Sequence, residues 1–295
     1  MGVVVRHALV QWHPVKRGYP RNLARLGEIL AELGRQRQRP QVLSLPEAAL
    51  TGYFLQGGVQ EVARSAAGIA ADLHELYSGH GWGEPLDVCL GFYERHRQDH
   101  YNSALYVTLG AGDPIIRHVH RKLFLPTYGV FDEERFTSRG SRIDAFDTSW
   151  GRAAILICED AWHSLSATIA ALKGADIIYV PTASPGRGLA EGTPRNVERW
   201  TLLARGISAE HGVFTVTTCL AGFEGGKGLG GASIITAPGG AVLAEAPILH
   251  EAIVEADLEI GAIARSRYES PLLADLKVNL PELMRGLAEA EEELP

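Results

Sequence analysis

The chain has 295 residues, of which 46% are hydrophobic and 21% charged, a composition that suits a globular protein with a sizeable core. Its 28 lysines and arginines against 35 acidic residues give a formal charge of -7, which argues against the basic surface that nucleic acid or anionic lipid would need. No run approaches the roughly 18 apolar residues of a membrane-spanning helix, and no signal peptide is recognisable. We therefore expect a cytoplasmic protein without nucleic-acid or membrane partners.

The order of the predicted elements indicates one domain in which paired strands alternate with helices. Turn residues at 110–114 and 238–240 join neighbouring strands into hairpins, so the sheets are expected to be mixed. Two such sheets packed face to face, each covered outside by helices, fit better than one doubly wound sheet. We expect this domain over residues 1–270, followed by a tail over 271–295 that packs on the domain or on a partner subunit. The predicted strands are 3–10, 42–45, 86–93, 103–109, 115–120, 153–157, 177–180, 213–220, 232–236, 241–244 and 252–256, and the predicted helices are 22–33, 60–77, 162–173 and 196–211.

Cys158 stands at the end of a predicted strand and directly before a predicted helix. The apolar run 153–157 is too short for a typical helix, and Gly151 bounds it. Glu159 and Asp160 then supply the negative charge that the first turn of a helix favours. A thiol at such a position lies near helix N–H groups that favour the thiolate, which would make it a nucleophile. The local pattern supports equally well a small buried side chain, which is the commoner role of a cysteine.

Glu47 and Lys122 also follow predicted strands, so they could meet Cys158 at the edges of the sheets. A cysteine hydrolase needs a base, a nucleophile and a positive group where an oxyanion develops, and these three residues are of the right types. Glu47 could equally be a charge at a helix start or a solvated loop residue. His163 is a competing base, but helical spacing would turn it away from Cys158.

Other motifs support weaker hypotheses. His118 and His120 share one face of a strand, but no third ligand has a recognisable spacing, so we expect packed or surface histidines rather than a metal site. The glycine-rich stretch 225–231 lacks the hydroxyl residue and the following helix of a phosphate loop, and predicts a flexible loop. The three cysteines are widely spaced, which predicts free thiols rather than a disulfide framework.

Three motifs, occurring in this order over nearly the whole chain, resemble those of the carbon–nitrogen hydrolase, or nitrilase, superfamily. This resemblance implies a four-layer α-β-β-α sandwich and a Glu-Lys-Cys triad, which falls here on Glu47, Lys122 and Cys158. A second glutamate of the family falls on Glu133, where it would orient the lysine and the base. The motifs are Leu45-Pro46-Glu47 with Gly52-Tyr53, His120-Arg121-Lys122-Leu123-Phe124-Leu125-Pro126, and Cys158-Glu159-Asp160-Ala161-Trp162.

The resemblance also implies a class of reaction. The stretch 122–136 is most similar to the glutaminase domain of glutamine-dependent NAD synthetase and to stand-alone amidases. We therefore expect a hydrolase of small linear amides or carbamoyl compounds that forms a cysteine thioester and uses no cofactor. The alternatives are a glutaminase-type subunit that supplies ammonia to a separate synthetase, a nitrilase, and a non-catalytic binding module. Nitrilases place Trp-Glu after the cysteine, whereas this chain has Glu159-Asp160, which favours an amide.

The family resemblance and the positions of the predicted loops suggest which residues contact the substrate: Tyr53, Tyr128, Glu159, Ser184 and Arg187. Arg187 would suit a substrate carboxylate but could equally face solvent. The resemblance further implies a homodimer or larger homo-oligomer, paired through the predicted helix 162–173 and reached by the tail.

Overall fold

Two six-stranded sheets form the centre of the computed structural model, which describes residues 2–80, 82–186 and 195–294. The first sheet has the strand order β14-β1-β2-β3-β4-β5 and the second β13-β12-β9-β8-β7-β6. Each combines parallel and antiparallel pairs, so both sheets are mixed, as predicted. The first sheet contains β1 (Val4–Gln11), β2 (Val42–Ser44), β3 (Leu86–His96), β4 (Asp99–Leu109), β5 (Ile115–Arg121) and β14 (Ala252–Glu259). The second contains β6 (Ala145–Asp147), β7 (Arg152–Ile155), β8 (Ile177–Thr182), β9 (Phe214–Cys219), β12 (Ile234–Thr236) and β13 (Val242–Glu245).

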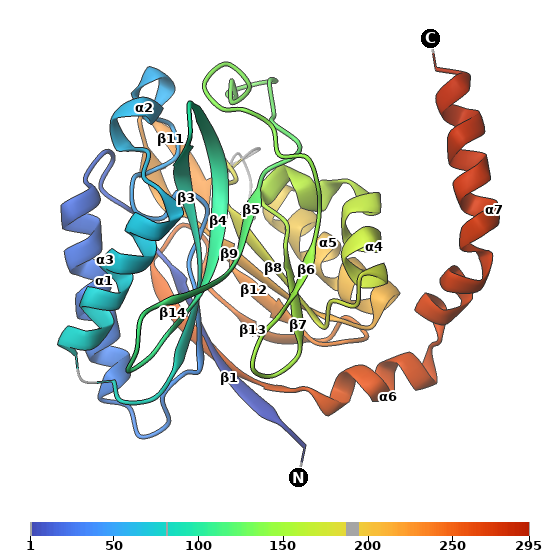
Figure 1. Ribbon diagram of the computed structural model, residues 1–295, viewed down its shortest axis with the longest axis horizontal. Helices are drawn as coiled ribbons and strands as arrows, with labels where there is room; N and C mark the ends of the chain where they lie inside the picture. Colours follow the sequence, from blue (N-terminus) through green and yellow to red (C-terminus); the bar gives the residue numbers. More distant parts are fainter. Residues whose placement is uncertain (1, 81, 187–194, 295) are drawn as a thin grey trace.

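Helices cover the outer face of each sheet (Figure 1). On the first sheet lie α1 (Tyr19–Gly34) and α3 (Ala66–Gly79), and on the second lie α4 (Ser164–Leu172) and α5 (Arg195–His211). Strand β1 shows why the sequences of the central strands are continuous apolar runs. Ala8 and Val10 pack in the core under α1 and α3, whereas Leu9 between them faces the second sheet. The four-layer α-β-β-α sandwich is therefore confirmed.

Three local predictions were wrong. The predicted helix 60–77 is two helices, α2 (Val59–Val62) and α3, because Ser65 caps α3 by accepting a hydrogen bond from Gly68 N at 3.0 Å. The glycine-rich stretch 225–231 is not a flexible loop: it supplies the turn and the second strand of a hairpin of β10 (Ala221–Glu224) and β11 (Lys227–Gly230). The helix expected directly after Cys158 begins only at Ser164, because a 3-10 turn over Cys158–Trp162 comes first; another 3-10 turn lies at Gln56–Gly58. A 3-10 turn, not an α-helix, therefore directly follows the elbow at Cys158.

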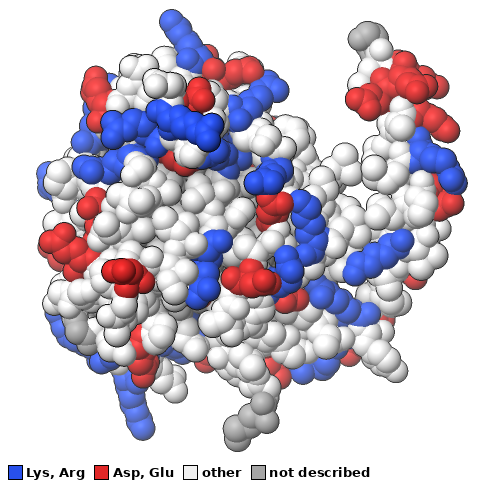
Figure 2. Space-filling view, in the orientation of Figure 1, with Lys and Arg blue, Asp and Glu red and all other residues white. Residues whose placement is uncertain are grey.

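The last two helices leave the sandwich. Helix α6 (Gly261–Glu269) follows β14, and α7 (Leu272–Glu292) then projects away from the body (Figure 1). Figure 2 shows both signs of charge interspersed over this face of the body, with acidic side chains gathered at the free end of α7. Of the helices that the structure describes, none combines the length and apolar character needed to cross a membrane.

Candidate active site

Three strand ends from the two sheets meet at one place. Glu47 lies beyond the end of β2 and Lys122 directly follows β5, both in the first sheet, whereas Cys158 lies beyond β7 in the second. The Lys122 Nζ atom lies 2.8 Å from Glu47 Oε1, and both charges affect the nearby Cys158 thiol. The structure thus brings together the carboxylate, the ammonium group and the thiol that were predicted at separate strand ends.

The Glu47 carboxylate is fully buried, and each of its oxygens has a partner. Besides Lys122, Oε1 accepts a hydrogen bond from Asn102 Nδ2 at 2.7 Å. The other oxygen, Oε2, accepts a hydrogen bond from the backbone N–H of Ala183 at 2.8 Å. Because Ala183 follows β8 of the second sheet, Glu47 is held by both sheets and has a fixed orientation.

Glu133 is a second carboxylate on Lys122. Its Oε1 lies 2.9 Å from Nζ and accepts hydrogen bonds from Tyr53 Oη at 2.5 Å and Asn102 Nδ2 at 3.0 Å. Burial raises the pKa of Glu133, and the Lys122 ammonium group opposes this shift only in part. Burial alone would lower the pKa of Lys122, but the charges of Glu133 and Glu47 outweigh it and raise that pKa well above its ordinary value. Lys122 therefore remains an ammonium group at neutral pH.

Cys158 is held in an unusual backbone conformation. Its φ angle of 46° lies in the left-handed region, which a residue with a Cβ rarely adopts, and its side chain is almost completely buried. Burial first, and the charge of Glu47 second, raise the pKa of the thiol well above its usual value, although Lys122 acts in the opposite direction. The resting cysteine is thus a thiol, and a nucleophilic thiolate requires a nearby proton acceptor.

His163 does not fill that role in this geometry. Its ring stacks on Phe124 with a centroid distance of 3.7 Å, and its Nε2 lies 3.8 Å from Glu159 Oε1. His118 and His120, for which packed or surface positions were predicted, both contact other side chains. His120 Nε2 lies 2.8 Å from Asp160 Oδ2, and His118 stacks on Phe146. Within the described ranges, no group of three or more His, Cys, Asp or Glu side chains is arranged to hold a metal ion.

The predicted substrate contacts have different surroundings. Tyr53 is buried and donates its hydroxyl hydrogen bond to Glu133, so it positions that carboxylate. Tyr128 is exposed, and its hydroxyl donates to Glu159 Oε2 at 2.9 Å. Ser184 Oγ accepts a hydrogen bond from Asn196 Nδ2 at 3.0 Å. Arg187 lies outside the described residues.

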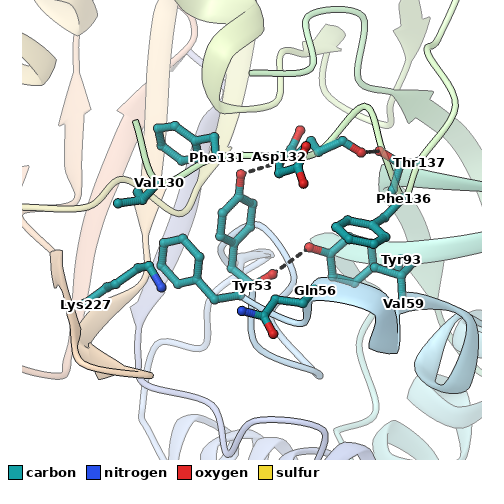
Figure 3. Close-up of a pocket in the computed structure, with 12 residues that line it drawn as sticks. Tyr53, Gln56, Val59, Tyr93, Val130, Phe131, Asp132, Phe136, Thr137 and Lys227 are labelled. Atoms are coloured by element: carbon teal, nitrogen blue, oxygen red, sulfur yellow. Dashed lines mark hydrogen bonds between the residues drawn. The ribbon is translucent and has the colours of Figure 1, made fainter. Parts of the chain in front are cut away.

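An aromatic pocket lies beside Glu133 (Figure 3). Tyr53 stands in its middle, and the hydroxyl of Tyr93 donates to the Tyr53 carbonyl oxygen at 2.9 Å. At one side the Lys227 ammonium group lies 4.6 Å from the centre of the Phe54 ring. Apolar walls with a few charged groups suit a small organic molecule.

Sequence reasoning missed the residues that hold the acidic pair in place. Asn102 bonds to both Glu47 and Glu133. It lies in the polar first half of β4, between Tyr101 and Ser103, so the sequence gives no signal that it is buried. Glu224 of β10 is buried and accepts hydrogen bonds from the backbone N–H groups of Tyr53, at 2.9 Å, and Phe54. No sequence pattern links these distant positions.

The sequence and the fold are both similar to those of known proteins. The carbon-nitrogen hydrolase family model matches residues 6–268. A glutamine-dependent NAD(+) synthetase from Rhodobacter capsulatus is 33% identical over 75% of this chain and 38% of its own length, so the chain spans less than half of that relative. An N-carbamoylputrescine amidase from Arabidopsis thaliana is 24% identical over 67% of this chain and 68% of its own length. The crystal structure of a carbon-nitrogen hydrolase from Helicobacter pylori G27 superposes with a TM-score of 0.80 at 22% identity, covering 94% of this chain and 97% of that one. The chain therefore belongs to the carbon–nitrogen hydrolase superfamily.

Proposed function

We propose that this chain is an amidase that hydrolyses a non-peptide C–N bond in a small linear amide or carbamoyl compound. The observation that supports this proposal is the buried Lys122 ammonium group, held between Glu47 and Glu133 and next to the Cys158 thiol. These groups are the base, the positive charge and the nucleophile that acyl transfer through a cysteine requires. The proposed steps use no metal or organic cofactor.

In the first half-reaction, Glu47 accepts the thiol proton while the Cys158 sulfur attacks the amide carbonyl carbon. The proton moves within the buried cluster, so this transfer leaves the total buried charge unchanged, whereas loss of the proton to solvent would add a second uncompensated negative charge. Lys122 and the backbone N–H of Glu159 stabilise the oxyanion, and one such donor can contribute about 3 kcal/mol. Glu47 then gives the proton to the nitrogen, the C–N bond breaks, and the acyl group remains as a thioester on sulfur.

In the second half-reaction, Glu47 removes a proton from a water molecule whose oxygen attacks the thioester carbonyl. The C–S bond breaks, the sulfur regains the proton, and a carboxylic acid leaves. Glu133 takes no proton in this sequence; it keeps Lys122 charged and in place. Tyr128, Glu159 and Ser184 are the residues that we propose to contact the substrate.

The test is a screen of amides, ω-amides and carbamoyl compounds with the native chain and two matched variants. Cys158→Ala should lower the best turnover at least about a thousandfold, because the thioester cannot form. Cys89→Ala is the control, since Cys89 is a buried thiol in the core between the sheets. Mass spectrometry should detect a thioester adduct on the native chain. Retained amide hydrolysis in Cys158→Ala would refute the mechanism.

A glutaminase-type subunit that supplies ammonia to a separate synthetase is the second candidate. The 33% identity to the Rhodobacter capsulatus synthetase favours it. Glutamine turnover that is slow alone and rises with an added synthetase would distinguish this role from a self-sufficient amidase. Nitrile hydrolysis is the weaker alternative, because Glu159-Asp160 follows the cysteine where nitrilases place Trp-Glu.

A further inference from the structure

Asp160 is fully buried close to Cys158, yet no step of the proposed reaction uses it. Its Oδ2 accepts a hydrogen bond from the backbone N–H of Ile157 at 3.0 Å and lies 2.8 Å from His120 Nε2. Its Oδ1 accepts hydrogen bonds from the backbone N–H groups of Leu123 and Phe124 at 2.9 and 3.0 Å. The carboxylate therefore has partners on both oxygens and from both sheets of the sandwich.

One set of these bonds holds the turn that contains the thiol. Asp160 N donates to Ile157 O at 2.9 Å, while Asp160 Oδ2 accepts from Ile157 N, so both backbone polar groups of Ile157 bond to Asp160. Cys158 lies inside the small ring that these bonds close. Its left-handed φ of 46° is a conformation that persists only where the surroundings enforce it. Asp160 provides that constraint.

The other set holds the segment directly after Lys122. The backbone N–H of Lys122 donates to Asn102 O at 2.9 Å, and its carbonyl oxygen accepts from Gly140 N at 2.8 Å. Leu123 and Phe124, the next two residues, both donate to Asp160 Oδ1. Because Lys122 follows a strand of the first sheet and Cys158 a strand of the second, the one carboxylate joins the two catalytic candidates across the interface between the sheets.

We propose that Asp160 is a positioning residue that fixes the position of the Cys158 sulfur relative to the Lys122 ammonium group. The inference rests on the proposed function, because it concerns the same thiol and the same lysine. Without Asp160, the elbow could relax toward ordinary backbone angles and the lysine segment could shift independently of it. A displacement of about 1 Å between reacting groups can reduce rate about a hundredfold. The chemical step should therefore suffer more than substrate binding.

Alkylation of Cys158 by iodoacetamide tests this inference without a known substrate. The second-order rate constant, followed by mass spectrometry from mildly acidic to alkaline pH, should fall at least about tenfold at neutral pH in Asp160→Asn. The pH profile should move to higher pH, because the thiolate loses its fixed relation to Lys122. With any amide that the screen identifies, kcat should fall while KM changes less than about twofold.

Asp87→Asn is the matched control. Asp87 is also a buried aspartate, and its oxygens accept hydrogen bonds from Tyr106 Oη and Thr108 Oγ1. It lies at the start of β3, before Gly91, the residue of that strand that approaches the Glu47 turn. It should lose thermal stability as Asp160→Asn does but keep the native alkylation rate. Folded Asp160→Asn that reacts within twofold of the native chain overturns the proposal, and so does an equal loss of rate in both variants.

If Asp160→Asn does not fold, His120→Phe tests the proposal instead. This variant removes one hydrogen-bond partner of Asp160 and keeps an aromatic ring at position 120. Its alkylation rate should fall severalfold, and an unchanged rate overturns the proposal. Failure of the proposed function would be seen in a different experiment, because Cys158→Ala would then still hydrolyse amides.

Discussion

Individual buried titratable residues in this protein are stabilised in different ways. Lys122 lies 2.8 and 2.9 Å from two carboxylate oxygens, whereas the hydrogen-bond partners of His7 are the Tyr179 hydroxyl at 2.8 Å and the Val5 carbonyl oxygen at 3.3 Å. Burial lowers the pKa of His7 from 6.5 to about 4, so the ring is neutral in the folded protein at neutral pH. His7 belongs to the first sheet and Tyr179 to the second. A single neutral ring thus links the two sheets.

This link makes folding sensitive to acid. The unfolded His7 takes up a proton near pH 6.5 and the folded one only near pH 4, so its contribution to stability is complete above 6.5 and is lost as the pH falls toward 4. The loss amounts to roughly 3 kcal/mol of unfolding free energy. Chemical denaturation gives the unfolding free energy at neutral and at acidic pH. The difference between these two free energies should be smaller for His7→Phe than for the native chain. His250→Gln, on the surface, is the control. An equal acid sensitivity in His7→Phe and the native chain would exclude His7 as the source.

At the scale of the elements, β3 approaches the Glu47 turn so closely that only glycine fits. A Cβ on Gly91 would lie 2.5 Å from Glu47 Cα and 2.6 Å from Pro46 O. Gly91→Ala should therefore push the Glu47 turn away from Lys122, lowering amide turnover and the alkylation rate of Cys158 at least about tenfold and stability by about 1–3 kcal/mol. Gly206→Ala is the control, because its Cβ would meet no atom within 4 Å and alanine favours helix α5. Native activity in Gly91→Ala would mean that the turn tolerates the displacement.

The elements differ in how far a sequence pattern can predict them. Strands such as β7 and β8 are buried on both faces, so their apolar runs alone indicate them. The positions of Glu47, Lys122 and Cys158 followed from strand ends and motif order, because those are local features. The β10–β11 hairpin was missed, since its glycines resemble a loop and the buried Glu224 contacts Tyr53 and Phe54 only in the folded chain. Long-range hydrogen bonds of this kind leave no local pattern.

At the scale of the whole molecule, α7 is a helix with little of the chain to pack against. Its first turn is anchored by the buried Leu273, and the helix begins against α4 and α5. Beyond that it projects from the body (Figure 1) with Val278 76% exposed and Met284 57% exposed. Leu165 of α4 and Leu202 of α5, two helices that α7 contacts, are also exposed. Apolar side chains on a projecting helix are poorly accommodated in water, and a second copy of the chain would bury them.

We therefore predict that the chain pairs with itself through α7, so that light scattering on the full chain gives at least twice the mass of one chain. Truncation after Ser270 removes the exposed apolar face and should lower that mass, because the buried area that favours association is lost. Val278→Ser should weaken association, whereas Lys277→Ser, at the exposed neighbouring position, should not. An unchanged mass after truncation would remove α7 from the interface.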